Sequence, residues 1–358
     1  MKILSVVGAR PNFMKIAPII RAISAKNPDV EQILVHTGQH FDEKMSDVFF
    51  RELELPKPDE HLGISGGSHA AQTAKIMMEF EPVLLRHNPD WLVVVGDVNS
   101  TVACALVASK LGIPIAHVEA GLRSRDRGMP EEINRLVTDA IADLLLTPSP
   151  DGDENLLSEG VPAEKIACVG NVMIDSLVRA LPKIEQSDIL TRMDLPKGEY
   201  VLATLHRPSN VDEPKMLAEL IAALNIVSET LPVIFPVHPR TRARLKDNNI
   251  EVAEGIRMVD PLGYFDFMGL MKSAKVVMTD SGGVQEETTY LGVTCLTVRP
   301  NTERPITIDE GTNRLVQPGK ETLLEAWNDI QANPPQPRCP KLWDGKAAER
   351  IADCLLNR

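Results

Sequence analysis

Apolar residues gather in short continuous runs that end in glycine or polar residues, and such runs predict buried parallel strands. In the first half of the chain they cover residues 2–7, 31–36, 91–95, 113–118, 144–146 and 166–169. The longer segments between them space apolar residues three and four apart, as in the helix predicted over residues 68–86. Strands that alternate with helices predict an α/β fold with a doubly wound parallel sheet.

The second half of the chain repeats this plan. Strands are predicted over residues 200–204, 233–236, 256–259, 275–279 and 294–298, and helices over 213–230 and 265–273. The crossing falls at Gly170-Asn171, and residues 182–198 end in a polar, linker-like stretch. We therefore predict an N-terminal Rossmann-like domain over residues 1–170 and a second over 171–345. Ligand-facing loops in both halves predict a cleft between the domains.

Composition narrows the functional classes. A chain of 358 residues with 43% hydrophobic residues is long enough for about two domains. Its net charge of −12 argues against nucleic acid and anionic membranes as partners. Five cysteines without a CxxC pair suggest reduced thiols and a cytoplasmic location. The N-terminus lacks the pattern of a signal peptide, and no apolar run is long enough to cross a bilayer.

Residues 278–287 read MTDSGGVQEE, with a buried strand before them and a helix that begins inside them. Ser281 is expected to cap that helix, while Gly282 and Gly283 let the backbone approach a ligand. Helix N-termini favour phosphate, and Glu287 lies about one turn further on, within reach of ribose hydroxyls. The stretch fits a binding site for a nucleotide diphosphate, and it fits an ordinary strand-to-helix turn equally well.

Charged side chains follow the predicted strands of the first half. Arg10 and Lys15 flank a loop at the end of the first strand, where open α/β sheets bind ligands, although surface cations are common. Asp97 could cap the next helix or present its carboxylate to the cleft. Glu119 precedes Ala-Gly, which is a poor cap and favours a functional role. Glu131 follows Pro130 at a helix start, where acids also act as dipole partners.

His206 and His238 both end strands of the second half. A lone histidine in such a position is usually structural, but two at matching strand ends favour a role for at least one. No His, Cys and Asp spacing fits a structural zinc site. The chain lacks both GxxxxGK[ST] and GxGxxG, which argues against a P-loop and a dinucleotide site.

Ordered motifs along nearly the whole chain resemble those of the non-hydrolysing UDP-N-acetylglucosamine 2-epimerases. They are GARPNFMK, VVGDVNST, HVEAGLRS, PEEINR, TLHRPSN, PVHPR, DSGGVQEE and NTERP. The resemblance implies a fold similar to GT-B glycosyltransferases, with two Rossmann-like domains and the active site in the cleft between them. It also implies that the last helix, residues 346–358, packs back on the first domain. Family members convert UDP-GlcNAc reversibly to UDP-ManNAc by eliminating UDP and adding it back, without a cofactor, and the family suggests a homodimer.

The resemblance also implies roles for individual residues. The implied catalytic set is Lys15, Asp97, Glu119, Glu131 and His206. The implied substrate-binding residues are Arg10, Arg135, Leu262, Phe267, Ser281, Gly282, Gly283, Glu287 and Arg304. Within these sets, His206 meets the departing phosphate, Glu287 the ribose and Phe267 the uracil. A possible effector site comprises Gln39, His40 and His238.

The chain departs from the family pattern at several positions. The first loop carries Ala9 and Asn12-Phe13-Met14 where the family usually has Thr and Glu-Ala-Ile, and Leu262 stands where Gln is frequent. The Arg-Gln pair of the effector site is absent near residues 66–70. Alternatives are an epimerase of UDP-2,3-diacetamido-glucuronic acid, a GT-B glycosyltransferase, a hydrolysing epimerase and a catalytically silent nucleotide-sugar sensor. Three carboxylates in the first half exceed the single base that a glycosyltransferase needs.

Overall fold

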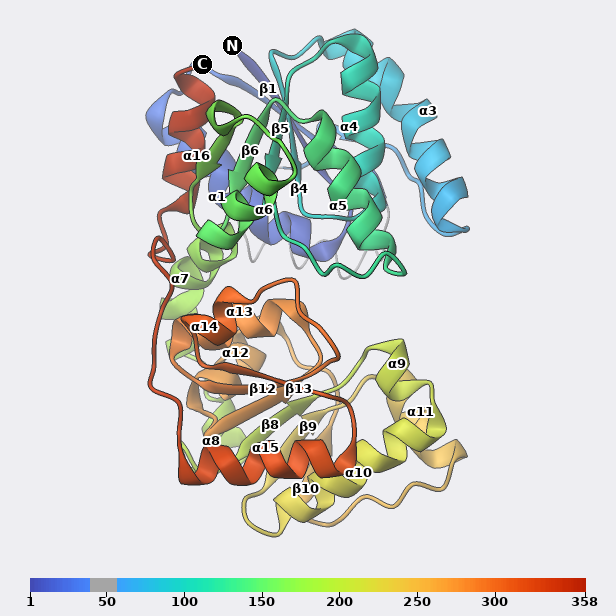
Figure 1. The fold of residues 1–358 in the computed structure, drawn as a ribbon, viewed down its shortest axis with the longest axis vertical. Coiled ribbons are helices and arrows are strands. Elements are labelled where there is room, and N and C mark those ends of the chain that lie inside the picture. Colours follow the sequence, from blue (N-terminus) through green and yellow to red (C-terminus); the bar gives the residue numbers. More distant parts are fainter. Residues whose placement is uncertain (39–56) are drawn as a thin grey trace. The chain divides into compact units, whose positions relative to one another are not determined.

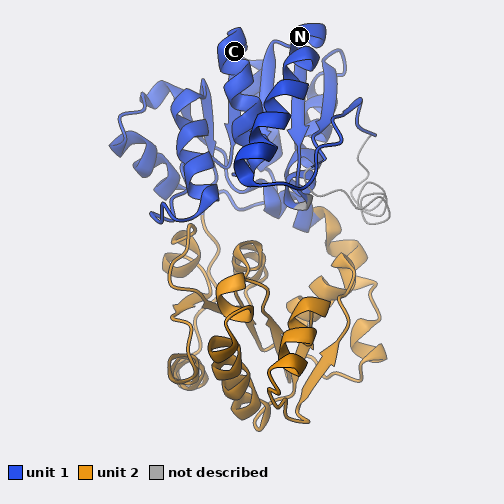
Figure 2. Cartoon of the chain, turned by 90° about the vertical axis from the view of Figure 1, so that its right-hand side faces the viewer, with its two compact units in different colours: residues 1–178, 341–358 blue, residues 179–340 orange. Residues whose placement is uncertain are grey.

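The structure is a computed structural model that describes residues 1–38 and 57–358. Its contacts divide the chain into two compact units, drawn in two colours in Figure 2. The first unit comprises Met1–Val178 together with Lys341–Arg358, and the second comprises Arg179–Pro340. Each unit is built around its own parallel sheet.

The sheet of the first unit has seven strands in the order β3-β2-β1-β4-β5-β6-β7, of which β1, β4, β5 and β6 are labelled in Figure 1. The chain thus starts in the middle, builds outward to one edge and then returns to build the other, as in a doubly wound fold. The strands are β1 (Lys2–Val7), β2 (Glu31–His36), β3 (Glu60–His61), β4 (Trp91–Val95), β5 (Ile115–Val118), β6 (Leu144–Thr147) and β7 (Ile166–Cys168).

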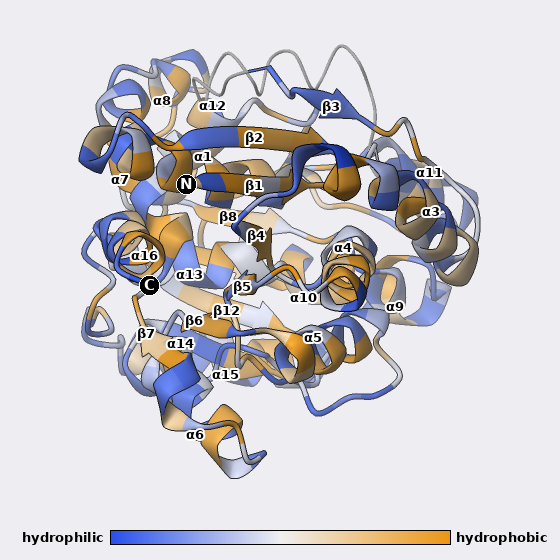
Figure 3. Ribbon diagram, turned by 90° about the horizontal axis from the view of Figure 1, so that it is seen from above, coloured by the Kyte–Doolittle hydropathy of each residue, from blue (hydrophilic) through white to orange (hydrophobic). Residues whose placement is uncertain are grey.

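Helices cover both faces of this sheet, so its strands are hydrophobic on both sides. In β1, Ile3 and Val7 belong to the core beneath α1 and α16, whereas Leu4 and Val6 belong to the core beneath α3 and α4. Figure 3 accordingly shows much of β1, β2 and β6 in the hydrophobic colour. The helices are α1 (Arg10–Lys26), α3 (His69–His87), α4 (Asn99–Leu111), α5 (Pro130–Ile141), α6 (Pro150–Ser158), the 3-10 turn η1 (Ala163–Lys165), α7 (Val172–Glu185, which runs into the second unit) and α16 (Ala347–Leu356).

The sheet of the second unit has six strands in the order β10-β9-β8-β11-β12-β13, the same winding pattern. Its strands are β8 (Val201–Thr204), β9 (Val233–Pro236), β10 (Ile256–Val259), β11 (Val276–Thr279), β12 (Thr294–Val298) and β13 (Asn313–Val316). Its helices are α8 (Ile189–Arg192), α9 (Pro208–Val211), α10 (Pro214–Ser228), α11 (Pro239–Asp247), α12 (Tyr264–Ser273), α13 (Gly282–Leu291), α14 (Ile306–Asp309) and α15 (Lys320–Ala332). The predicted pair of doubly wound, Rossmann-like sheets is confirmed.

The sequence misses one edge strand in each sheet. β3 has only two residues, both polar, and β13 carries Asn313 and the exposed Arg314, so neither gives the apolar run of a buried strand. The end of residues 182–198 is irregular, in keeping with the predicted linker-like stretch, while the earlier part is helical, since α7 runs to Glu185 and α8 covers Ile189–Arg192.

The first unit ends later than the predicted residue 170, because the first turns of α7 pack on it. Val172 joins the core beneath α1, and the Ser176 hydroxyl donates to the carbonyl of Met14. α16 packs against α1 in the same unit (Figure 1). The Asp175 carboxylate on α7 accepts hydrogen bonds from the first N–H groups of α16, those of Ala347 at 3.1 Å and Ala348 at 2.7 Å. The carboxylate thereby anchors the start of the last helix.

Candidate active site

The carboxyl ends of three neighbouring strands gather the charged residues of the first unit. β1, β4 and β5 lie side by side, and Asp97 and Glu119 come just after β4 and β5. Lys15 lies on α1, the helix that follows β1. Since parallel strands end at the same edge, this topology places one cation and two carboxylates at the edge where doubly wound sheets bind ligands.

Lys15 and Glu119 form a buried ion pair between Nζ and Oε2, with side chains 8% and 7% exposed. Glu119 adopts a φ of +68°, a left-handed conformation that a non-glycine residue takes at a cost. The backbone beside the pair is Gly96, with a φ of +67°, and a Cβ there would lie 3.3 Å from Lys15 Nζ. The ion pair therefore lies in a tightly packed place, next to a strained backbone at Glu119 and to a glycine at position 96 that leaves no room for a side chain.

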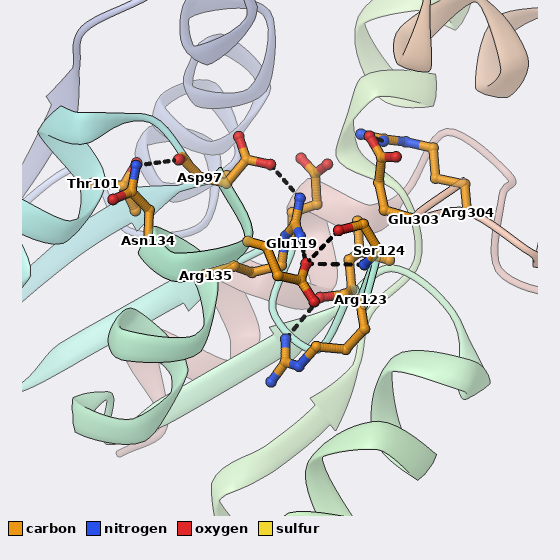
Figure 4. Close-up of polar contacts among 12 residues, drawn as sticks. Asp97, Thr101, Glu119, Arg123, Ser124, Asn134, Arg135, Glu303 and Arg304 are labelled. Atoms are coloured by element: carbon orange, nitrogen blue, oxygen red, sulfur yellow. Dashed lines mark hydrogen bonds and ion pairs between the residues drawn. The ribbon is translucent and has the colours of Figure 1, made fainter. Parts of the chain in front are cut away.

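Asp97 does not cap α4, because the N-cap position belongs to Val98. Its Oδ2 instead accepts from Arg135 Nη2 at 2.5 Å, and the Asp97 side chain stays 28% exposed (Figure 4). Arg135 is 2% exposed and its other terminal nitrogen binds the Glu132 carboxylate. The sequence allowed two roles for Asp97, a helix cap or a carboxylate available to a ligand. The structure excludes the helix cap, and the partly exposed carboxylate is held by the buried Arg135.

Glu132 is a residue whose role the sequence did not reveal. Its carboxylate accepts from the backbone N–H and the hydroxyl of Ser124 at 2.9 and 3.0 Å, and from the N–H of Arg125 at 2.9 Å. At 2% exposure it fastens the loop after β5 to α5, beyond any interaction with the helix dipole. Its neighbour Glu131 is half-buried in the first turn of α5 and has no polar partner among the described residues.

The expected loop around Arg10 and Lys15 is helical, because α1 begins at Arg10. Asn12 explains the early start: its Oδ1 accepts from the N–H groups of Gly8 and Ala9 at 3.2 and 2.9 Å, which caps the helix from within. Its Nδ2 donates to the carbonyl of Val95 at 3.2 Å and so ties α1 to the end of β4. The structure gives no description of the Arg10 side chain.

In the second unit, Asp280 and His206 form a hydrogen-bonded pair at the ends of the adjacent strands β11 and β8. His206 Nδ1 lies 2.8 Å from Asp280 Oδ1, with Asp280 fully buried and the His206 side chain 55% exposed. The N–H groups of His206 and Arg207 also donate to this carboxylate. Burial raises the pKa of Asp280, but the hydrogen bond and charge of His206 and the backbone donors outweigh it, so the pKa lies below its usual value. The carboxylate therefore fixes the histidine through Nδ1.

The glycine stretch begins α13 as predicted, but Ser281 does not cap it by a side-chain hydrogen bond. The backbone turn is held instead by the Thr279 hydroxyl, which accepts from the N–H of Ser281 at 3.0 Å. A Cβ on Gly283 would meet nothing within 4 Å, whereas one on Gly282 would lie 3.1 Å from Arg304 Nη1. The start of α13 is thus open at Gly283 and packed against the Arg304 side chain at Gly282, and a helix N-terminus of this kind favours an anion.

Arg304 is held by two carboxylates. Its Nε lies 2.8 Å from Glu286 Oε1 and its Nη1 lies 2.6 Å from Glu303 Oε1. Arg299, another residue that sequence reasoning missed, pairs with the second oxygen of Glu303 at 2.9 Å while 2% exposed. Although burial raises the pKa of Glu303, the charges of Arg304 and Arg299 bring it well below its usual range. These residues form one rigid cluster against Gly282.

The residues expected to bind the nucleoside lie on α12 and α13. The Tyr264 hydroxyl lies 3.3 Å from Glu287 Oε1, and the Glu287 residue is 7% exposed. Phe267 on α12 and Leu262 just before it are half-buried. His238 has a structural function: its Nδ1 accepts from the N–H of Arg240 at 3.3 Å and caps α11. The other two effector candidates, Gln39 and His40, lie outside the described residues.

The described residues contain no group of three His, Cys, Asp or Glu side chains that could hold a metal ion. The first unit offers carboxylates in different environments beside a lysine, and the second offers a histidine, a helix N-terminus and a buried arginine cluster.

Comparisons of the sequence and of the fold with known proteins all indicate the same enzyme family. The sequence profile of the family described as UDP-N-acetylglucosamine 2-epimerase matches residues 22–356. The UDP-N-acetylglucosamine 2-epimerase of Methanocaldococcus jannaschii is 43% identical over 99% of both chains. A crystal structure of the enzyme from this organism in complex with UDP-GlcNAc and UDP superposes with a TM-score of 0.90, at 42% identity over all of both chains. The UDP-2,3-diacetamido-2,3-dideoxy-D-glucuronate 2-epimerase of Pseudomonas aeruginosa is 40% identical over the full length of both chains.

Proposed function

The chain belongs to the UDP-N-acetylglucosamine 2-epimerase family, and we propose that it interconverts UDP-GlcNAc and UDP-ManNAc by inverting C2 of the sugar. The observation that carries the proposal is the set of charges at the ends of β1, β4 and β5. It comprises the buried Lys15–Glu119 pair and the half-accessible Asp97. Inversion at a carbon whose proton is a poor acid needs groups of this kind in distinct environments.

The proposed reaction proceeds by elimination and re-addition. A carboxylate takes the C2 proton while the C1–O bond breaks, the C2–H electron pair becomes the C1–C2 double bond of a 2-acetamidoglucal, and UDP leaves with the C1–O electrons. Return of UDP to C1 and of a proton to the opposite face of C2 completes the inversion. Asp97, Glu119 and Glu131 form the acid–base set for these two proton transfers, and Lys15 holds Glu119 in place.

The second unit carries the groups that we assign to the pyrophosphate and the nucleoside. In its imidazolium form His206, held by Asp280 through Nδ1–H, can donate its Nε2–H to a phosphate oxygen. The N–H groups at the start of α13 and the Ser281 hydroxyl supply further donors, and the helix dipole favours the negative charge that develops on the leaving group. Glu287, presented by Tyr264, takes the ribose hydroxyls, and Phe267 lies by the uracil.

We assign contacts with the substrate to three further residues. Arg10 and Arg304 neutralise phosphate charge, and Leu262 contributes backbone contacts before α12. Arg304 is already oriented by Glu286 and Glu303, so its guanidinium loses little conformational entropy when a ligand binds. Arg135 acts on the substrate through Asp97, which it holds.

A second candidate substrate is UDP-2,3-diacetamido-glucuronic acid, since a full-length relative that carries this name is 40% identical. The experiment that separates the two is incubation of the purified protein with each UDP-sugar in turn, without cofactor, followed by chromatography of the UDP-sugars. The proposal predicts an equilibrium mixture from UDP-GlcNAc and little change of the diacetamido sugar. Epimerisation of the diacetamido sugar alone would replace the substrate and retain the chemistry. Turnover of neither sugar would overturn the proposed function.

We further propose that two copies of the chain associate through α3. Its solvent face carries an apolar stripe of Ala71, Ala74, Met78, Pro82 and Leu85 at spacings of three and four, with Met78 71% and Leu85 64% exposed. An apolar helix face of this kind is typical of a partner surface. Size-exclusion chromatography with light scattering tests this: the dimer mass should fall to that of a monomer in Met78→Lys/Leu85→Lys. An unchanged mass in the variant, or a monomeric parent, contradicts the proposed interface.

We place the protein in the cytoplasm, where its five cysteines would stay reduced. All five are free thiols in the structure. No helix among the described residues is long and apolar enough to cross a membrane.

A further inference from the structure

His117 is a fully buried histidine in β5, two residues before Glu119, with a polar partner at each ring nitrogen. Its Nδ1 lies 2.6 Å from Asp139 Oδ1, and its Nε2 lies 2.8 Å from the carbonyl oxygen of Gly96. The residue has no exposed surface, so water does not compete for either nitrogen. The proposed chemistry has not used this residue.

Both partners of His117 are hydrogen-bond acceptors. A carbonyl oxygen can only accept, so Nε2 must carry a proton to bind Gly96. An ionised carboxylate can also only accept, so Nδ1 must carry a second proton to bind Asp139. A neutral imidazole has one N–H and satisfies only one of these contacts, whereas the imidazolium ion satisfies both.

The surroundings of Asp139 favour its ionised form, which closes the alternative in which Asp139 donates to a neutral ring. Its Oδ2 accepts from Arg123 Nη1 at 2.7 Å and from the N–H of Gly121 at 3.1 Å. Arg123 in turn pairs with Glu159 at 2.6 Å. With His117 charged, these two cations and two carboxylates balance.

The contacts of this cluster reach both candidate carboxylates. Gly96 is the residue before Asp97, and Gly121 comes two residues after Glu119. Asp139 and Arg135 lie one turn apart on α5, so the same helix holds Asp97 through Arg135 and the ends of β4 and β5 through Asp139. Gly96 also packs against the Lys15–Glu119 pair, where a Cβ would lie 4.0 Å from Glu119 Oε2. A shift of the Gly96 carbonyl would therefore change the distance between the carboxylates of Asp97 and Glu119.

We propose that His117 is a positioning residue that donates from both ring nitrogens, an imidazolium that ties Gly96 to Asp139 and so sets the spacing of Asp97 and Glu119. The charged ring donates to two acceptors on its opposite edges, whereas a neutral imidazole can donate to only one of them. Because small misplacements of catalytic groups reduce turnover strongly, loss of this tether lowers kcat and leaves substrate affinity nearly unchanged. The kinetic part of this inference rests on the proposed epimerase function; the protonation state does not.

The protonation state is tested directly on the full-length protein by ¹H–¹⁵N correlation spectra of histidine-labelled samples at neutral pH. The chain has eight histidines, and the spectrum of His117→Asn assigns the signal. We expect both ring nitrogens of His117 to show the protonated shift of an imidazolium. A signal with one unprotonated nitrogen would overturn the proposal, whatever the activity of the protein.

The kinetic arm uses two variants and a matched control. His117→Asn and Asp139→Asn should each lower kcat by about tenfold or more while KM changes by less than about threefold, and the double variant should lose little more than either one. His87, which pairs with Glu60 at 3.0 Å on the surface of the same unit, provides the control, and His87→Asn should match the parent. If His117→Asn folds and keeps the parent kcat, the positioning role is wrong. If the variant does not fold, the spectrum of the parent protein still decides the protonation state, and Asp139→Asn decides the role.

Discussion

The side-chain nitrogen of Lys15 contacts Oε2 of Glu119, and both side chains are less than one tenth exposed. The pair joins α1 to the carboxyl end of β5, and each charge compensates the other in a place that water hardly reaches. A catalytic carboxylate with a fixed cation beside it has its orientation and its charge set by one contact.

Lys15→Met should therefore abolish the function of Glu119 while the fold persists. The substitution leaves a buried carboxylate without its cation, which costs about 3–5 kcal/mol if the charge stays. We expect kcat to fall by about 10²-fold or more, measured by the rate of UDP-ManNAc formation. Lys26→Met is the control on the same helix, since Lys26 pairs with Asp353 in an exposed bridge at 2.7 Å and should be dispensable. A Lys15→Met enzyme with parental kcat would rule out the role given to the pair.

Asp97→Asn should remove turnover and leave UDP binding near normal. The amide keeps the shape of the carboxylate but cannot take a proton from carbon, and Arg135 retains its second partner Glu132. We expect kcat to fall by at least about 10³-fold, with the Kd for UDP from calorimetry changed by less than about threefold. Asp143→Asn, a half-exposed aspartate just before β6 at the opposite end of the sheet, should behave like the parent. Loss of UDP affinity with retained turnover would contradict the role of Asp97.

Asp280→Asn should impair His206 without removing it. The Asp280 carboxylate accepts from His206 Nδ1 and from two backbone N–H groups, and an amide can replace only part of this set. We expect kcat to fall about 10- to 100-fold, in a variant that retains the histidine. Parental kcat in Asp280→Asn would show that the histidine needs no orientation.

The same variant has a predicted pH signature in stability. The pKa of Asp280 in the folded protein lies below its ordinary value of 3.8, so its ionisation stabilises the fold above that pH. This contribution is lost as pH falls through the lower folded-state pKa. Urea unfolding of the parent should therefore weaken more steeply below about pH 4 than that of Asp280→Asn. Parallel curves for the two proteins would contradict the assignment.

Asp175→Asn should stabilise the protein increasingly as pH rises. Burial raises the pKa of Asp175 to about 6, against the N–H groups of Ala348 and Ala347, which lower it. Since the folded-state pKa is raised, the contribution of Asp175 is fully present below about pH 4 and is lost as pH rises through about 6. The amide still accepts from the start of α16, so the variant should gain about 1–2 kcal/mol over the parent between pH 4 and 7.

Urea unfolding at pH 4, 5.5 and 7 measures this difference. Asp175→Ala removes the cap altogether and should lose about 1 kcal/mol relative to Asp175→Asn at every pH. Asp353→Asn, whose side chain is 55% exposed, serves as the control for removing a carboxylate from α16 itself. A flat difference for Asp175→Asn would show that Asp175 is not the group that titrates.

The sequence predicts the strands well because burial on both faces leaves a readable pattern. Residues 2–7, 31–36, 91–95, 233–236, 256–259 and 294–298 are strands with the predicted bounds. The edge strands β3 and β13 were not predicted from the sequence, because their partly exposed positions tolerate polar residues. The positions of Asp97 and Glu119 at strand ends follow from the same pattern, since a polar residue after an apolar run marks the edge of the sheet.

The partners of these side chains could not be predicted. The first-turn position of Glu132 in α5 fits a partner of the helix dipole, yet its carboxylate binds the loop at Ser124, because the path of that loop depends on tertiary packing. His117 and Asp280 lie inside motifs that were recognised, but only the coordinates show which acceptors and donors they meet. Motif order and strand ends therefore locate a candidate site, while the contacts that tune it require the fold.

The most direct test of the proposed function is a proton NMR time course of the purified protein with UDP-GlcNAc in deuterated water, without added cofactor. Removal of the C2 proton and its replacement from solvent predict that UDP-ManNAc appears with deuterium at C2, and that the remaining UDP-GlcNAc takes up deuterium as the reaction reverses. Formation of UDP-ManNAc with the original hydrogen at C2 would contradict the elimination and re-addition carried out by the carboxylates. Accumulation of free ManNAc and UDP would instead show a hydrolysing enzyme.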